Sequence, residues 1–149
     1  FQAFARALGG ACIHDPAHAE LGTIELMLTE AGSADPVFGS LPDRFLVHAG
    51  HQDAVVALPP DAVRLASSGI VANQAFTFRG LPIYCTQFHP EMTLDDLLIR
   101  IRSYPEYIDK ILHISYEEFV TRCEETTQVN RIVPRFIEHI FEETKARPS

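Results

Sequence analysis

The sequence predicts an α/β domain whose sheet has an antiparallel portion. A short helix comes first, because apolar residues recur at helical spacing between Phe1 and Leu8. Short apolar runs follow as far as Phe88, separated by glycine, proline and polar residues, which is typical of antiparallel strands. From Leu94 onward the apolar period is helical again. This order fits a single domain, residues 1–149, that ends in a helical tail over residues 103–149.

The first helix is expected to end at Gly9 and Gly10, because glycine readily adopts the backbone conformation that closes a helix. The predicted strands then cover residues 11–13, 23–29, 44–49, 62–67, 73–79 and 83–88. We expect residues 14–22 to form a loop and Gly50 to break the third strand. Gly80 is expected to turn the fifth strand into the sixth.

Three helices are predicted after the strands. Thr93 should cap the first, with Asp95 and Asp96 in the first turn, where the helix dipole favours carboxylates. Ser115 should cap a short second helix that runs through Cys123. The third helix carries an apolar stripe that we expect to pack on the sheet. The stripe consists of Val129, Ile132, Val133, Phe136, Ile137, Ile140 and Phe141.

The composition argues against several classes of function. The net charge of −8 disfavours nucleic acid and anionic membranes as partners, because both select for clustered Lys and Arg. No apolar run approaches the roughly 20 residues that span a bilayer, and the first residues do not resemble a signal peptide. Three cysteines without a CxxC pair predict reduced thiols in a cytoplasmic protein, with no metal site and no cofactor.

The segment YCTQFHPEM, residues 84–92, places a histidine and a glutamate at the end of an apolar run. Pro90 disfavours helix at His89, so Glu91, two residues along an extended chain, can point to the same side. Its carboxylate could accept the Nδ1 proton, fix the tautomer and leave Nε2 free to take a proton from a nucleophile. The same spacing also suits a strand-end histidine followed by a solvated charge.

Several motifs resemble class I glutamine amidotransferases, in the same order along the chain. GLPIYCTQFHPEM (80–92) resembles that family's C-terminal signature, a strand followed by Q-F-H-P-E. ARALGG (5–10) resembles the helix and glycine pair that follow its nucleophile elbow. GHQDAVVALPPDAVRLASS (50–68) resembles its S-H-x-D-x-V…L-P-x-G…A-S-S segment, and NQAF (73–76) its strand before the signature.

This resemblance runs from Phe1 to about Leu98 and implies a flavodoxin-like class I glutamine amidotransferase fold, a three-layer sheet arrangement that is N-terminally incomplete here. It implies hydrolysis of the glutamine side-chain amide through a γ-glutamyl thioester, with His89 as general base and acid and Glu91 as its orienting partner. The segment implied to bind glutamine through its backbone comprises Gly50, His51, Gln52 and Asp53. The family's serine before the histidine is a glycine here, which removes any contact of that serine side chain.

The family's nucleophile elbow, G-x-C-x-G-H-Q, is absent from the sequence, and we expect the chain to begin just after it. Cys12, Cys85 and Cys123 are each expected to be small buried apolar residues. Along an extended strand Cys85 would lie ~13 Å from His89, beyond hydrogen-bond reach. We therefore expect a C-terminal part of an amidotransferase domain that is inactive alone. The resemblance allows a synthetase partner that accepts the ammonia, but the sequence does not identify the acceptor.

Three other interpretations remain open at this point. The same machinery could cleave γ-glutamyl bonds of peptides, or the domain could be a non-catalytic interaction module. A metal-binding protein is the third, since HxxxH and HxxH spacings occur, although a proline and a glycine interrupt the helix that would align them. The candidate ligands are His14, His18, His48, His51, Asp15 and Asp53.

Overall fold

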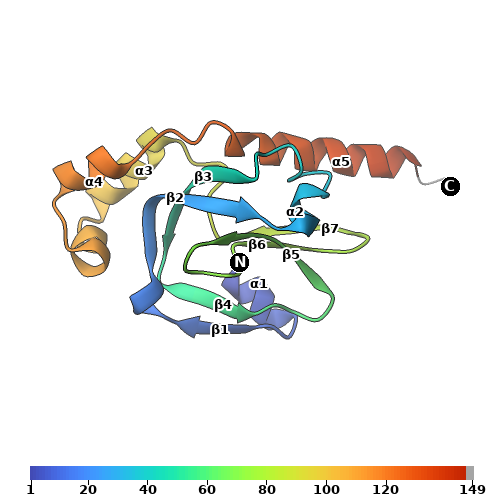
Figure 1. The fold of residues 1–149 in the computed structure, drawn as a ribbon, viewed down its shortest axis with the longest axis horizontal. Coiled ribbons are helices and arrows are strands. Elements are labelled where there is room, and N and C mark those ends of the chain that lie inside the picture. The colour runs from blue at the N-terminus through green and yellow to red at the C-terminus, as the bar shows by residue number, and fades with distance from the viewer. Residues whose placement is uncertain (147–149) are drawn as a thin grey trace.

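The computed structural model describes residues 1–146, with side chains described as far as Phe141, and shows two antiparallel sheets flanked by helices (Figure 1). The strands are β1 (Ala11–His14), β2 (Glu20–Leu28), β3 (Arg44–His51), β4 (Asp53–Ala57), β5 (Ala62–Ser68), β6 (Ala75–Phe78) and β7 (Leu81–Thr86). The larger sheet has the order β3-β2-β5-β6-β7, and β1 pairs with β4 in the smaller one. All described strand pairs are antiparallel.

The helices are α1 (Gln2–Ala7), α2 (Glu30–Ser33), α3 (Leu94–Ser103), α4 (Tyr116–Arg122) and α5 (Ile132–Ala146). Two 3-10 turns, η1 (Pro16–His18) and η3 (Val129–Arg131), and one π-helical turn, η2 (Ile108–Leu112), complete the elements. The predicted caps are present: the side chain of Thr93 accepts a hydrogen bond from the backbone of Asp96, and that of Ser115 from the backbone of Glu118. Within the described residues, no helix combines the length and the apolar character that crossing a bilayer requires.

The five-stranded sheet curls so that its two edges approach one another. β3 and β7 are the outer strands, yet the chain that follows β7 returns to β3, where the His89 N–H donates to the carbonyl of His48 at 3.0 Å. The rings of Phe45 and Phe88 meet edge to face beside this contact, with centroids 6.3 Å apart. The curl therefore places His89, which follows β7, against β3, although β3 and β7 lie at opposite edges of the sheet order.

A bend at one end of the sheet creates a corner in the molecule. β1 continues through η1 into β2, and β3 continues through Gln52 into β4 (Figure 1). The pairing is maintained on both sides of the bend, because Glu20 lies opposite His51 and His14 lies opposite Asp53. The segment predicted to bind glutamine therefore lies at this corner.

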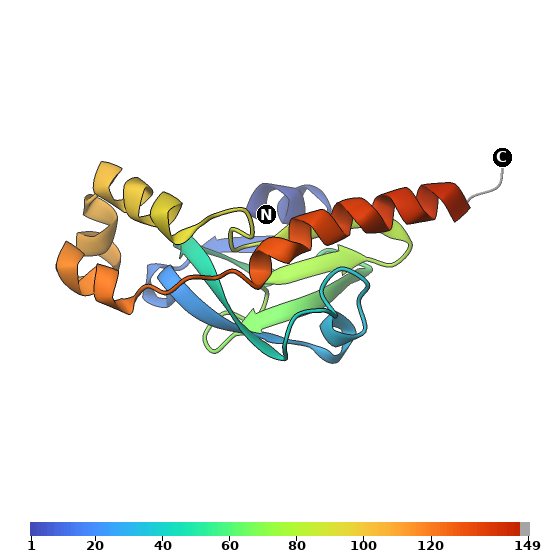
Figure 2. The same ribbon diagram turned by 90° about the horizontal axis from the view of Figure 1, so that it is seen from above.

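The helices cover both faces of the larger sheet, which gives the three layers that the sequence predicts (Figures 1 and 2). Neighbouring residues of β6 point to opposite faces: Ala75 packs in the cluster that includes Ile132 and Phe136, whereas Phe76 packs against Ala5 of α1 and the ring of Phe1. The elements α3, η2 and α4 form a separate cluster around Ile101, Ile108 and Phe119, at the end of the molecule that carries the corner.

Several sequence-based predictions about the strands are wrong. The expected loop 14–22 contains the start of β2, because Glu20, Leu21 and Gly22 pair with β3. Gly50 does not break β3: it lies opposite Leu21, and the strand continues to His51. Gly80 does turn β6 into β7, with a φ of +73°. The strand β4 and the short helix α2 were not predicted.

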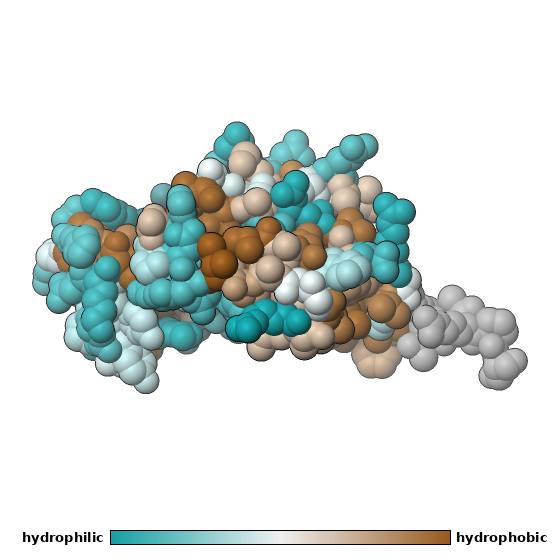
Figure 3. All heavy atoms as spheres, turned by 90° about the horizontal axis from the view of Figure 1, so that it is seen from below, coloured by the Kyte–Doolittle hydropathy of each residue, from teal (hydrophilic) through white to brown (hydrophobic). Residues whose placement is uncertain are grey.

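The apolar stripe of the last helix is buried on one side only. Val129 and Ile132 are buried, and Phe136 packs against Tyr84 of β7 with ring centroids 5.6 Å apart. Val133, Ile137 and Phe141 are exposed, so the prediction that the whole stripe packs on the sheet is wrong for these three. Further apolar side chains gather on the face seen in Figure 3, on the side of β1, β4 and α1; the exposed large ones on these elements are Phe4, Ile13 and Val56.

Candidate active site

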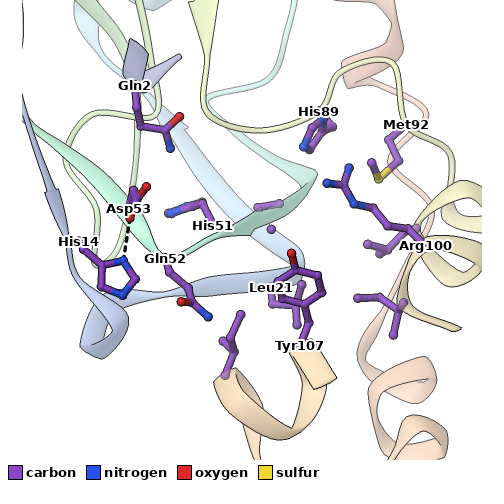
Figure 4. Close-up of a pocket in the computed structure, with 15 residues that line it drawn as sticks. Gln2, His14, Leu21, His51, Gln52, Asp53, His89, Met92, Arg100 and Tyr107 are labelled. Atoms are coloured by element: carbon purple, nitrogen blue, oxygen red, sulfur yellow. Dashed lines mark hydrogen bonds and ion pairs between the residues drawn. The ribbon is translucent and has the colours of Figure 1, made fainter. Parts of the chain in front are cut away.

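A cavity of about 410 Å³ lies where the corner of the sheet faces α3 and η2 (Figure 4). Residues from Ala49 to Asp53 form its strand side, and Leu97 and Arg100 of α3 face them. The cavity also contains His89, which the curl of the sheet brings to the same place. It therefore joins segments that are far apart in the sequence.

His89 and Glu91 form the contact that the sequence predicts. His89 Nδ1 lies 2.8 Å from Glu91 Oε1, and the two side chains are 31% and 63% exposed. The backbone of His89 is fixed at both ends, since its N–H donates to His48 and its carbonyl accepts from the N–H of Met92. With Nδ1–H donating to the carboxylate, the lone pair of Nε2 is left free, and no described side chain hydrogen-bonds it.

The four residues predicted to bind substrate all line this cavity. Gln52 is held in the turn between β3 and β4, because its carbonyl accepts from the N–H of Asp15 at 2.8 Å. The carboxylate of Asp53 is engaged by His14, whose Nδ1 lies 2.7 Å from Asp53 Oδ1. Gly50 leaves the backbone of β3 uncovered by a side chain at the cavity wall. The structure thus brings the predicted site residues together around one space.

His51 belongs to a second histidine–glutamate pair, which is buried. Its Nε2 lies 2.9 Å from Glu20 Oε2, and each side chain is only 5% exposed. The side-chain amide of Gln74 also donates to Glu20 Oε2 and reaches Ser68 Oγ at 3.4 Å. Two donors on one buried carboxylate oxygen offset part of the cost of removing its charge from water. This network joins β2, β3 and β5 behind the cavity.

His48 lies next to the candidate pair in the interior. Its side chain is fully buried, and Nδ1 is 3.4 Å from Thr23 Oγ1. Burial lowers the pKa of His48, because a charged imidazolium would lose its hydration; the carboxylate of Glu125 opposes this shift, and the charge of His89 adds to it. His48 is therefore held neutral beside a histidine that remains open to solvent.

None of the three cysteines lines the cavity, and each is only partly buried, so the prediction that they are buried is wrong. The thiol of Cys12 donates to the carbonyl of Gln2 at 3.3 Å. Cys85 packs against the cluster that contains Phe76, and Cys123 packs against the cluster that contains Phe119. Burial raises the pKa of both Cys85 and Cys123, which lowers the fraction of reactive thiolate at neutral pH.

The metal-binding interpretation lacks a ligand cluster in the described part of the chain, where no three or more His, Cys, Asp or Glu side chains converge. The histidines that suggested it are divided among separate partners. His14 contacts Asp53, whereas His18 contacts Asp15 at 2.8 Å. His51 is already bonded to Glu20.

Sequence reasoning missed three polar residues of the cavity: Gln2, Arg100 and Tyr107. Arg100 is exposed, but it follows Leu97 by three residues, and helical spacing puts both near one face of α3, so its position beside the cavity was available as a signal. Gln2 and Tyr107 reach the cavity only through the tertiary arrangement, and the local sequence has no signal for either.

The comparisons with known proteins identify the family of this chain and its fold. The family model described as glutamine amidotransferase class-I matches residues 1–97. The chain therefore belongs to the class I glutamine amidotransferase family. A solved glutamine amidotransferase from Thermotoga maritima is similar in fold, with a TM-score of 0.74 and 24% identity, over 93% of this chain and 57% of that one. The predicted flavodoxin-like class I fold is thus confirmed.

Two curated relatives are named as subunits of glutamine-hydrolysing GMP synthases. The protein from Thermoplasma acidophilum is 35% identical over 83 residues, which cover 56% of this chain and 40% of the relative. The protein from Methanospirillum hungatei is 39% identical over 72 residues, which cover 48% of this chain and 37% of the relative. The matched part of the chain thus spans about two fifths of the length of these relatives.

Proposed function

We propose that this protein is the part of a glutamine amidotransferase that supplies the histidine and glutamate of a Cys-His-Glu triad, and that the cysteine comes from a segment N-terminal to Phe1. The observation that carries the proposal is the 2.8 Å contact of His89 with Glu91 beside the cavity, with Nε2 left free. The positions of Cys12, Cys85 and Cys123 away from this cavity support an external nucleophile.

In the proposed reaction, His89 Nε2 takes the proton of the cysteine thiol, and the thiolate attacks the side-chain carbonyl carbon of glutamine. Glu91 stabilises the imidazolium that forms and keeps the ring oriented. When the tetrahedral intermediate collapses, His89 returns the proton to the leaving nitrogen, so ammonia departs and a γ-glutamyl thioester remains. His89 then deprotonates a water molecule that attacks the thioester, which releases glutamate and restores the thiol.

We propose that the corner between β3 and β4 binds glutamine. The segment Gly50–Asp53 lines the cavity, and Gln52 is anchored by its hydrogen bond from Asp15. Because the curated relatives are named as subunits of glutamine-hydrolysing synthases, we propose that ammonia from this site is used by a synthetase partner.

The experiment compares ammonia release from glutamine by two proteins: the 149-residue chain and a version extended N-terminally through the proposed cysteine. Activity only in the extended protein, lost when that cysteine becomes serine, is the expected result, because a histidine alone cannot replace covalent attack. Activity of the short chain that Cys12→Ser or Cys85→Ser abolishes would overturn the assignment. Inactivity of both proteins would favour a non-catalytic module instead.

A further inference from the structure

One cation faces the cavity without an acidic partner. Arg100 lies on α3, and its side chain points into the cavity on the side of His89 and Met92 (Figure 4). Two other arginines of the described chain form ion pairs, Arg44 with Glu25 at 2.6 Å and Arg122 with Glu118, and Arg100 is the one arginine among the residues that line the described cavity. No ion pair or side-chain hydrogen bond engages the guanidinium of Arg100 among the residues that the structure describes.

The cavity has no free carboxylate to neutralise this charge. Asp53 is the one acidic residue that lines the described cavity, and His14 holds its carboxylate at 2.7 Å. Arg100 is itself exposed, and its guanidinium keeps its charge and its N–H donors available to an anion that enters the cavity. The electrostatics of the cavity thus favour a ligand that carries a negative charge near Arg100.

Tyr107 adds a hydroxyl to the same side. Its ring packs edge to face with that of Tyr104, with centroids 6.1 Å apart. It precedes the π-helical turn η2, in which the His113 N–H donates to the carbonyl of Ile108 at 2.9 Å, while His113 has a φ of +54°. Such turns are uncommon, and they are frequent at functional sites. Figure 4 shows the hydroxyl of Tyr107 directed toward the cavity.

From these contacts, we propose that Arg100 and Tyr107 bind the carboxylate of the substrate. A guanidinium presents parallel N–H donors that match a carboxylate in geometry and charge, and a tyrosine hydroxyl can add a third donor. The inference rests on the proposed function, and it makes the substrates free amino acids or γ-glutamyl compounds with an ionised carboxylate. Both residues lie beyond residue 97, where the family match ends.

The test is a binding titration, followed by NMR, of the protein extended N-terminally through the proposed cysteine, with that cysteine replaced by serine. The ligands are L-glutamine and its α-amide, in which a neutral amide replaces the carboxylate. Arg100→Met should weaken glutamine binding at least about tenfold and leave binding of the α-amide unchanged, because only glutamine carries the charge that the guanidinium binds. Arg100→Lys should recover part of the loss, and Tyr107→Phe should cost less than Arg100→Met.

Arg64→Met is the matched control, since Arg64 is an exposed arginine of β5 outside the cavity, and it should bind both ligands as the wild type does. Three results would overturn the proposal. Arg100→Met could weaken the binding of glutamine and of the α-amide equally, or it could weaken neither; the protein that keeps Arg100 could also fail to bind glutamine. Because binding is measured without the nucleophile, these outcomes are independent of the ammonia-release assay. If Arg100 did not bind the carboxylate, the proposed hydrolysis of glutamine would still be possible. If the protein did not hydrolyse glutamine, Arg100 could still bind the carboxylate.

Discussion

Two histidine–glutamate pairs lie beside the same cavity. Their nitrogen–oxygen distances are nearly equal, but their side chains differ in exposure to water. His89 and Glu91 are 2.8 Å apart and 31% and 63% exposed. His51 and Glu20 are 2.9 Å apart and 5% exposed each. The first pair comes from one short stretch of chain, whereas the second joins β2 to β3 across the sheet.

The comparison indicates that a short histidine–carboxylate distance does not define a proton-transfer group. An imidazole must reach its reactant and regain its proton, so a free, accessible ring nitrogen is required. His89 has one, while His51 uses Nε2 for Glu20 and keeps Nδ1 buried without a described hydrogen-bond partner. This difference supports the proposal that the exposed pair carries the chemistry, whereas the buried pair links β2 to β3 at the corner.

The largest expected effect is the loss of turnover in His89→Ala, measured in the protein extended through the proposed cysteine. Glutamine hydrolysis should fall about a thousandfold or more, because the general base is removed, and stability should change little at this partly exposed position. His18→Ala is the matched control: His18 contacts Asp15 at 2.8 Å but lies outside the cavity. Equal losses in both variants would remove the distinction between the two histidines.

The buried pair is expected to affect stability. Glu20→Ala should lower the free energy of unfolding by about 3–5 kcal/mol in a urea titration, because His51 and Gln74 lose their shared acceptor in the interior. Glu25→Ala is the control, since Glu25 forms an exposed pair with Arg44, and it should cost at most about 1 kcal/mol. If the two variants were equally stable, the structural role of the buried pair would be refuted.

A smaller difference in stability is expected between two phenylalanine variants of α5. Phe136→Ala should cost about 2 kcal/mol, which is below the value of about 3–5 kcal/mol for a fully buried phenylalanine, because Phe136 is only partly buried against Tyr84. Phe141 is 63% exposed, so Phe141→Ala should change stability by less than about 0.5 kcal/mol. Thermal or urea unfolding would measure both variants, and a larger loss for Phe141→Ala would argue that its face of the helix is covered.

The smallest effect is a pH dependence from His48. Because burial lowers the pKa of His48 in the folded state, the unfolded chain binds more protons as the pH falls through its usual pKa of about 6.5. The contribution of His48 to stability is thus fully present above that pH and decreases below it, until the folded protein is protonated as well. Unfolding of His48→Gln should depend less on pH between about 7.5 and 5.5 than that of the wild type.

The control for this pH dependence is the wild-type protein, unfolded in the same buffers at each pH. A profile of His48→Gln that parallels the wild type would mean that another group dominates the titration in this range. The free energy of unfolding at each pH, from urea titrations, is the quantity to compare.

Local sequence signals predicted the features that depend on a few neighbouring residues. Thr93 and Ser115 cap their helices because a hydroxyl needs only the backbone N–H three residues later. The His89–Glu91 contact was predictable for the same reason, since Pro90 fixes the backbone between them. The exposed pair was thus visible in the sequence.

Features that depend on pairing across the sheet were not visible. The Glu20–His51 pair requires the register of β2 on β3, which no local pattern supplies. Gly50 was predicted to break a strand, but its φ is not positive in the structure, and pairing opposite Leu21 keeps it extended. The burial of the apolar stripe on α5 was overestimated. Helical spacing shows which residues share a face, but it does not show how much of the sheet lies beneath that face.

The central claim is that the exposed pair serves a thiol outside these 149 residues. Intact-mass and peptide-mapping spectrometry of the extended protein, quenched with acid during glutamine turnover, tests it most directly. We expect a γ-glutamyl adduct on the N-terminal cysteine that forms much more slowly in His89→Ala. An adduct on Cys12, Cys85 or Cys123, or an equal rate of formation in His89→Ala, would contradict it.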